Sequence, residues 1–272
     1  MTEPPGTGGR GGNEGGKTIQ SVETALSVLE YIREHGEVGV SEAATVLDCS
    51  KSTVHHHLTT LVERGYVEKV DGRYRLGLTF LALGGEVRER QRLYHLGKDD
   101  VDALADRTGE KARLIVEHDG RGITLYQSTG ENVADTDTHT HVGSVEELHC
   151  TAAGKAFLAE LSADELDAYL ADAPLTAYTD ATITDPDALR EELEAIRSRG
   201  VAFDDEERYE GVRCVASAID VGTGELLGAL SVSGPTERID DDRFRTDIPN
   251  RIQNVVGVVE INTTYSEWTD AF

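Results

Sequence analysis

Hydrophobic residues near the start of the chain recur at the three- and four-residue spacing of an amphipathic helix. They are Val22, Ala25, Leu26, Val28, Leu29 and Ile32. Gly36 is expected to end this helix, since glycine favours the position just past a helix end. We expect Ser41 to cap a short second helix, because its hydroxyl can accept the exposed amide hydrogens of the first turn. That helix should end near Leu47.

A third helix is predicted to begin after Ser50 or Ser52, either of which can cap it. Its expected buried residues are Val54, Leu58, Leu61 and Val62. Gly65 should end it. Two alternating segments then follow, YVEKV and RYRLG, and Asp71-Gly72 between them is a strong signal of a hairpin turn. Three helices followed by a two-stranded hairpin predict a winged helix-turn-helix.

Residues 79–97 carry a further helical pattern, which we interpret as a linker and dimerisation helix. Its hydrophobic positions are Phe80, Leu81, Leu83, Val87, Leu93 and Leu96. Gly84-Gly85 interrupts the pattern and predicts a kink there. Charged residues on the other side of the helix indicate that one side is solvated while the apolar side meets a partner. Residues 1–17, which are rich in glycine, are predicted to form a disordered tail.

From residue 98 to residue 266, predicted helices and strands are mixed. Strands are expected at KARLIVEHDG and GITLYQST, and CVASAIDVGTGELLGALSVSGP should form a hairpin that turns at GTGE. Helices are expected at DDVDALADRTG, TAAGKAFLAEL, SADELDAYLAD, DPDALREELEAIRSRG and IPNRIQNVVGVVEINTTY. Strands linked by helices on one side indicate an α+β sensor-like domain. The predicted domains are therefore a tail at 1–17, a winged helix at 18–78, a linker at 79–97 and a sensor domain at 98–266.

The charge of the chain is strongly negative and unevenly spread. Lys and Arg number 26 against 51 Asp and Glu, which gives a net charge of −25. Abundant acid with little lysine is typical of proteins that stay solvated in very salty cytoplasm, so we expect a halophilic host. Residues 1–80 carry a net charge of −3 and residues 81–272 carry −22, and positions 49–62 contain no acid. This asymmetry indicates a nucleic-acid partner for the N-terminal part.

Several function classes are not favoured by the sequence. No apolar run approaches the roughly 18 residues of a membrane span, and the N-terminus lacks the pattern of a secretory signal. The three scattered cysteines form no disulfide framework and suit a reducing cytosol. AAGKAF lacks the flanking residues of a phosphate loop, and no GxSxG motif occurs. We expect a cytoplasmic protein without membrane contact, catalytic activity or cofactor.

Four segments, in order, carry a pattern that points to one family. They are QSVETALSVLEYI, SKSTVHHHLTTLVERGYVEKVDGRYRLGLTFLALG, LHCTAAGKAFLAEL and RGVAFDDEERYEGVRCVASAIDVGTGELLGALSVSGP. From about Thr18 to Tyr265 the chain resembles the IclR family of transcriptional regulators. The resemblance implies a winged helix that binds operator DNA, a linker helix that dimerises, and a C-terminal GAF-like domain that binds a small effector. It also implies a homodimer or dimer of dimers. Many members repress catabolic genes and some activate them.

The start of the third predicted helix carries the side chains expected to contact DNA, because a recognition helix places its N-terminal residues deepest in the major groove. They are Lys51, Ser52, Thr53, His55 and His56, to which the hairpin adds Arg73 and Arg75 for phosphate or the minor groove. Lys51 can bind a phosphate or a guanine edge, and the hydroxyls reach phosphates or bases. The alternative is that KSTVHHH is simply a solvated helix end.

The resemblance places an effector pocket between the segment entering TAAGKAF and the strands containing CVASA and LSVSG. Carried over residue by residue, its members are Ala152, Ala153, Asp204, Cys214, Ser231 and Ser233. Backbone amides at a helix start suit a carboxylate. Ser231 and Ser233 lie two apart on a strand, so both hydroxyls face one side. The alternative is that the two serine hydroxyls form hydrogen bonds within the sheet and that Cys214 is a small buried hydrophobic residue. We expect double-stranded operator DNA and a small, carboxylate-bearing metabolite as partners.

A segment rich in histidine leaves a second class of function open. His139, His141, His149 and Cys150, with Cys214, could lie close together, and this donor set is typical of zinc. That interpretation would make the protein a zinc-dependent enzyme or a metal sensor. The spacing matches no recognised zinc finger. We therefore favour the interpretation that these are exposed histidines of a loop that binds no metal. The sequence also departs from the family pattern here, since Leu148 replaces the usual proline and many members have alanine at the position of Cys150.

Overall fold

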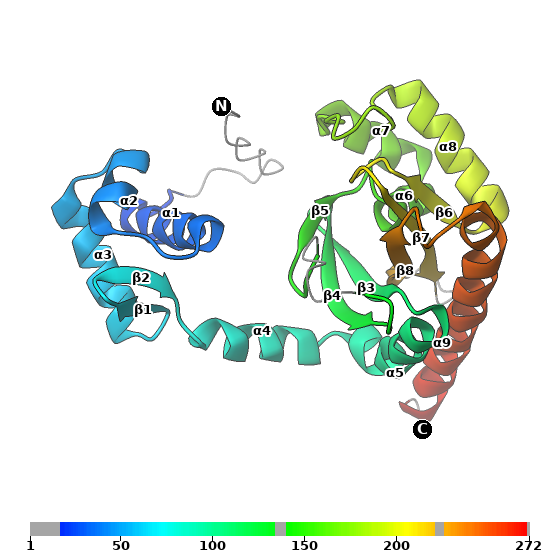
Figure 1. Cartoon of the computed structure of the whole chain (residues 1–272), viewed down its shortest axis with the longest axis horizontal. Helices are drawn as coiled ribbons and strands as arrows, with labels where there is room; N and C mark the ends of the chain where they lie inside the picture. The colour runs from blue at the N-terminus through cyan, green and yellow to red at the C-terminus, as the bar shows by residue number, and fades with distance from the viewer. Residues whose placement is uncertain (1–16, 134–139, 221–225, 271–272) are drawn as a thin grey trace. The chain divides into compact units, whose positions relative to one another are not determined.

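The computed structural model describes residues 17–133, 140–220 and 226–270 (Figure 1). The chain divides into two compact units between Val87 and Arg88, inside the segment predicted to be the linker. The predicted GTGE turn and His139 lie outside the described residues.

The N-terminal unit is a winged helix-turn-helix, as the hydrophobic pattern predicts. It consists of α1 (Gln20–His35), α2 (Val40–Val46), α3 (Lys51–Glu63), β1 (Val67–Val70) and β2 (Arg73–Leu76). Its core is built from Val28, Ile32, Val38, Ala43, Ala44, Val54, Leu58, Val67 and Tyr74. Asp71 and Gly72 join the antiparallel strands with φ values of 50° and 84°. Positive φ at both central residues is the geometry that an Asp-Gly hairpin turn requires.

Two local predictions in this unit are wrong. The N-cap of α2 is Gly39 and not Ser41, because the Glu42 carboxylate accepts the Gly39 backbone N–H at 2.9 Å and the helix therefore begins one residue before Ser41. Val62 is 36% exposed, whereas Val54 and Leu58 form the buried face of α3. The cap of α3 is Ser50, whose Oγ accepts the backbone N–H of Thr53 at 3.0 Å.

The predicted linker helix is two helices. Helix α4 (Thr79–Glu89) includes Gly84-Gly85 and continues past them. The helical conformation is interrupted at Arg90-Gln91, and α5 (Arg92–Thr108) follows. Glycine lowers the stability of a helix without preventing it from forming. A Cβ at either glycine would meet nothing within 4 Å, so no close contact requires glycine at these positions. Helix α5 also includes the segment DDVDALADRTG that was predicted as a separate helix.

The C-terminal unit contains one antiparallel sheet in the strand order β5-β4-β3-β8-β7-β6. Its strands are β3 (Lys111–His118), β4 (Arg121–Thr129), β5 (Val145–Glu147), β6 (Ala202–Asp205), β7 (Val212–Asp220) and β8 (Leu226–Pro235). Asp119-Gly120 joins β3 to β4, again with positive φ at both residues. Strands β3 and β8 lie side by side at the centre of the sheet.

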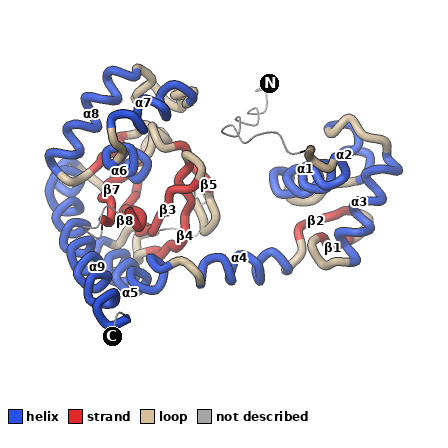
Figure 2. The backbone as a smooth tube through the Cα atoms, turned by 180° about the vertical axis from the view of Figure 1, so that it is seen from behind, coloured by secondary structure: helices blue, strands red, loops and turns tan. Residues whose placement is uncertain are grey.

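Helices cover both faces of this sheet, so the expectation of helices on one side is wrong (Figure 2). One face packs on α5 and α9 (Ile248–Asp270), which follows a π-helical turn at Arg243–Asp247. The other face packs on α6 (Ala152–Glu160), α7 (Ala163–Asp172) and α8 (Pro186–Arg199). Strand β8 shows the reason, because Leu230 and Val232 enter the first core while Ala229 enters the second. None of the helices in the described part of the chain is long and apolar enough to cross a membrane.

Candidate functional site

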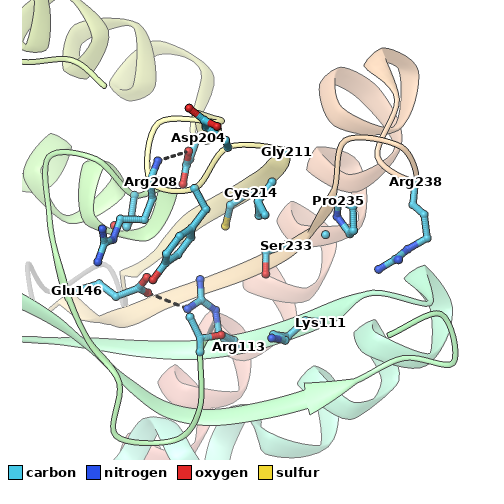
Figure 3. A pocket seen from close by; sticks show the side chains of 16 residues that line it. Lys111, Arg113, Glu146, Asp204, Arg208, Gly211, Cys214, Ser233, Pro235 and Arg238 are labelled. Carbon is cyan, nitrogen blue, oxygen red and sulfur yellow. Dashed lines mark hydrogen bonds and ion pairs between the residues drawn. The ribbon is translucent and has the colours of Figure 1, made fainter. Parts of the chain in front are cut away.

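A row of four side chains across the sheet lines a cavity on the face that carries α6 (Figure 3). Lys111 of β3 pairs with Ser233 of β8, Ser233 pairs with Cys214 of β7, and Cys214 pairs with Asp204 of β6. Residues paired directly across strands point to the same face. With strands about 4.8 Å apart, the row extends over roughly 14 Å. The cavity above it has a volume of about 360 Å³.

The cavity is lined by more cations than the sequence predicted. These are Lys111, Arg113, Arg208 and Arg238. Arg113 donates to Glu146 at 2.8 Å, and Arg238 to Glu110 at 2.8 Å. The Arg208 guanidinium stacks 3.8 Å from the centre of the Tyr178 ring. The Nε atoms of Arg113 and Arg208 are buried without a hydrogen-bond partner among the described residues. Buried donors without acceptors favour a guest that supplies oxygen atoms, and a carboxylate supplies them with the right charge.

Asp204 closes one end of the row and is 5% exposed. Its Oδ1 accepts the backbone N–H of Glu207 at 2.8 Å and that of Arg208 at 3.3 Å. Burial, assisted by the charge of Glu207 and opposed by Lys155, raises the pKa of Asp204 to about 7. Lys155 is itself buried and forms an ion pair with Glu207. Near neutral pH the Asp204 carboxyl can therefore accept a hydrogen bond or, when protonated, donate one.

Three of the predicted pocket residues, Asp204, Cys214 and Ser233, line the cavity. Ala152 and Ala153 lie in the core at the start of α6, and the residue before them, Thr151, lines the cavity instead. Ser231 points to the same face of β8 as Ser233 but is fully buried, and its hydroxyl has no hydrogen-bond partner among the described residues.

The sequence reasoning missed the basic side chains of the cavity. A signal for two of them was present, because Lys111 and Arg113 alternate with Ala112 and Leu114 along β3. Charges at every second position of an otherwise apolar strand indicate a polar surface on one face of the sheet. Arg208 and Arg238 lie in connections, where nothing in the local pattern indicates that they turn toward the cavity.

The start of α3 presents its predicted DNA-contacting side chains to solvent. Lys51, Ser52, Thr53, His55 and His56 are all exposed. No acidic residue lies in the first turn of α3, and Ser50 fixes the helix start. The hydroxyl of Thr53 lies 2.8 Å from that of Ser50, so its orientation is set by the cap.

The two predicted arginines of the wing already have carboxylate partners. Arg73 donates to both carboxylate oxygens of Glu42 at 3.0–3.1 Å and to the carbonyl oxygen of Glu37 at 2.6 Å. Arg75 pairs with Glu68 at 2.9 Å and with Glu37 at 3.8 Å. Arg73 thus connects the hairpin to α2 and to the Glu37 carbonyl through several bonds, whereas Arg75 makes two ion pairs; the ion pairs of both arginines are about half exposed and exchange readily with solvent.

The predicted metal candidates are only partly brought together. His149 and Cys150 are neighbours and both are buried. His141 is exposed, and its ring and backbone contact Ser144. Within the described residues, the side chain that joins His149 and Cys150 is Glu147, which the sequence reasoning did not select.

A winged helix-turn-helix in one unit and a polar, cation-lined cavity in the sheet domain of the other define the class of DNA-binding transcriptional regulators with a ligand-binding domain. Residues 21–71 match the family described as "IclR helix-turn-helix domain". Residues 86–256 match "Bacterial transcriptional regulator IclR C-terminal". The chain belongs to the IclR family, which consists of transcriptional regulators and not of enzymes.

Known proteins resemble the chain along most of its length. It is 34% identical over 247 residues to the probable HTH-type transcriptional regulator ArcR of Halobacterium salinarum, covering 90% of this chain and 94% of that protein. The crystal structure of Thermotoga maritima IclR matches with a TM-score of 0.75 and 28% identity, over 89% of this chain and 98% of that chain. An IclR homologue from Microbacterium hydrocarbonoxydans, complexed with 4-hydroxybenzoate, shares the fold at 21% identity, with a TM-score of 0.75 over 89% and 98% of the two chains.

Proposed function

We propose that this regulator binds operator DNA through α3 and controls catabolic genes in response to a small, carboxylate-bearing metabolite held in the cavity. The observation that supports the effector part is that the buried Nε donors of Arg113 and Arg208, beside the Lys111–Asp204 row, have no acceptor among the residues that the structure describes. Such donors have a free-energy cost until a guest supplies the acceptor. A carboxylate group of the ligand would supply that acceptor.

At the DNA, Lys51, Ser52 and Thr53 lie in the first turn of α3 and make the deepest contacts in the major groove. His55 and His56 extend the contact along the exposed side of the helix. Arg75 binds a phosphate by exchanging its exposed carboxylate partners. Arg73 acts indirectly, because its bonds to Glu42 and Glu37 hold the wing against α2.

In the cavity, the effector carboxylate accepts from Arg208 and Arg113, near Thr151 at the N-terminus of α6. Ser233 and Asp204 bind the other polar groups of the ligand, and Cys214 provides a small apolar contact between them. Ala152, Ala153 and Ser231 are buried behind the residues that line the cavity and pack against them. The ligand named for the Microbacterium homologue, 4-hydroxybenzoate, is itself a carboxylate, which is consistent with this assignment.

Exposed apolar side chains support assembly into a homodimer or a dimer of dimers. On α4, Leu81, Leu83 and Val87 are 73%, 43% and 50% exposed, and α4 has no buried residue. On α1, Val22 and Leu26 are also half exposed. Pairing of α4 with its copy buries this surface. Effector binding then alters how the two copies sit and changes the spacing of the two recognition helices, and therefore the fit to the half-sites.

The acidic, lysine-poor composition supports function in the cytoplasm of a salt-adapted organism, and the similarity to a Halobacterium protein agrees with that host. The effector proposal is tested by thermal unfolding at high salt against a panel of small mono- and dicarboxylates. We expect one member to raise the melting temperature of the wild type and to leave Arg208→Gln unchanged. A ligand that stabilises both proteins equally, or no stabilising carboxylate at all, would overturn the assignment.

A further inference from the structure

We propose that Glu147, His149 and Cys150 bind a divalent transition-metal ion, and that zinc is the ion that this donor set suits best. One ligand atom of each residue lies within 4.8 Å of the other two. None of the three lines the effector cavity, so the metal site stands independently of the proposed function.

The hydrogen bonds of His149 leave one ring nitrogen available as a ligand. Nε2 lies 2.9 Å from the carbonyl oxygen of Thr176. A carbonyl only accepts, so Nε2 must carry a proton. With Nε2 donating to this carbonyl, Nδ1 is the ring atom that can act as a ligand in the cluster. Histidine ligands in metal sites are usually held in this way, with the second nitrogen donating to a backbone carbonyl.

The lone pair of Nδ1 faces a buried carboxylate oxygen of Glu147. Glu147 Oε1 accepts from Arg121 at 2.8 Å. Its other oxygen, Oε2, is buried, lies 3.6 Å from Nδ1 and makes no close hydrogen bond among the described residues, although the Tyr178 hydroxyl interacts with the same carboxylate. Two lone-pair atoms that face each other in a buried site repel unless a cation lies between them. The arrangement therefore calls for a positive charge at this point.

Cys150 favours a metal ion over a proton as that charge. Its Sγ belongs to the same cluster, and the residue is fully buried. A proton shared by His149 and Glu147 would not be stabilised by a nearby thiol. Imidazole, thiolate and carboxylate together, in contrast, are typical ligands of zinc. Binding of the metal would displace the thiol proton, because the thiolate is the form that binds zinc.

The separations fit a tetrahedral ion after small side-chain adjustments. Zinc lies about 2.0–2.2 Å from nitrogen and oxygen ligands and about 2.3 Å from sulfur, which places tetrahedral ligands roughly 3.3–3.6 Å apart. The Nδ1 to Oε2 distance of 3.6 Å is already close to this range. With one carboxylate and one thiolate, the zinc charge is balanced. A solvent molecule completes the four ligands, as in zinc sites with three protein ligands.

The position of the cluster gives the metal a structural consequence. Glu147 is the last residue of β5, and Cys150 immediately precedes Thr151, the N-cap of α6. A metal ion held by all three would fix the short connection between the strand and the helix. Because Thr151 lines the cavity, this connection also sets one wall of it.

Zinc binding to the full-length protein tests the proposal. The metal-free protein is titrated with zinc against a chromophoric chelator, in high salt with excess magnesium to occupy surface carboxylates. Cobalt is then used as a probe, since a cobalt–thiolate bond gives a charge-transfer band. Cys150→Ser, His149→Gln and Glu147→Gln each remove one ligand. Cys214→Ser, which removes the other buried thiol, and His141→Gln, which removes an exposed imidazole, are the matched controls.

We expect one zinc ion per chain and a thiolate band with cobalt in the wild type and in both controls. Each ligand variant should weaken zinc binding by about 100-fold or more. Zinc binding that survives Cys150→Ser and His149→Gln, or is lost in Cys214→Ser, would overturn the site. If a ligand variant fails to fold, as judged by circular dichroism, the wild-type cobalt spectrum decides, because a complex without the sulfur band contradicts the proposal.

Discussion

The carboxylate of Asp204 accepts the backbone N–H of Glu207 at 2.8 Å while both side chains are buried beside the cavity. The pKa of Asp204 is raised to about 7, mainly by burial, whereas an aspartate in an unfolded chain titrates near about 4. The folded protein therefore binds one more proton than the unfolded chain between those values. By linkage, this residue makes stability fall as pH rises from about 4 to 7.

Asp204→Asn should remove that dependence, because the amide oxygen can still accept the two backbone N–H groups but does not ionise. The measurement is the melting temperature of both proteins at pH 5 and pH 8 in high salt. We expect the variant to gain stability relative to the wild type at pH 8 compared with pH 5. A difference between the two proteins that is the same at both pH values would show that Asp204 is not protonated at pH 5.

Gly154 in α6 is expected to tolerate no side chain. A Cβ there would overlap the backbone of Leu148, which cannot move away as a flexible side chain could. Gly154→Ala should destabilise the C-terminal unit by about 3 kcal/mol or more. Gly84→Ala is the matched control, since that helical glycine meets nothing within 4 Å and alanine should stabilise α4 by up to about 1 kcal/mol. Chemical unfolding of both variants measures the two effects, and equal stability of the two would contradict the packing of α6.

The two serines of β8 should behave differently although they share one face. Ser233→Ala should weaken binding of the stabilising carboxylate by about tenfold, because Ser233 lines the cavity. Ser231→Ala should leave affinity unchanged and stabilise the fold by up to about 1 kcal/mol, since its buried hydroxyl has no partner among the described residues. Calorimetric titration and unfolding of each variant provide the two measurements. If Ser231→Ala lost more affinity than Ser233→Ala, the ligand would contact Ser231, and the proposed binding site would be wrong.

Loss of the Lys51 charge should weaken DNA binding without affecting the cavity. Lys51→Ala removes an exposed cation from the first turn of α3, and we expect a loss of about tenfold in operator affinity. Lys98→Ala removes a partly exposed charge in the C-terminal unit and serves as the control. Fluorescence anisotropy at matched salt measures both. Equal losses in the two variants would mean that only net charge matters.

The apolar surface of α4 should hold the proposed dimer together. Leu81→Glu places a charge on the most exposed hydrophobic position of α4 and should convert the dimer to a monomer at micromolar concentration. Val145→Glu, at a 53% exposed position on β5, is the control and should remain dimeric. Light scattering after size exclusion distinguishes the two states. A Leu81→Glu dimer would move the interface elsewhere.

The elements that the sequence predicts best are those with local signals. Asp71-Gly72 and Asp119-Gly120 both adopt positive φ, as hairpin turns require, and Ser50 caps α3 with its own side chain. The error at Ser41 arose because Glu42 supplies the cap from three residues inside the helix. The break at Arg90-Gln91 was missed because Gly84-Gly85 offered a stronger local signal than any at the break itself.

The cavity could be predicted only in part, because its composition depends on strand pairing. The resemblance to a known family led to Asp204, Cys214 and Ser233. That Lys111 completes the same row follows only from the register between β3 and β8, which no local pattern encodes. The complete burial of Ser231 could not be predicted from the sequence either, because it depends on how α6 packs over the sheet.

The role of α3 as the recognition helix is tested most directly by the binding of purified protein to sheared genomic DNA of its own host at native salt, followed by sequencing of the retained fragments. We expect a small number of discrete sites upstream of catabolic operons, with lower occupancy for Lys51→Ala and with occupancy that changes when the stabilising carboxylate is added. Retention without discrete sites, or an unchanged profile for Lys51→Ala, would contradict the assignment of α3 as the recognition helix.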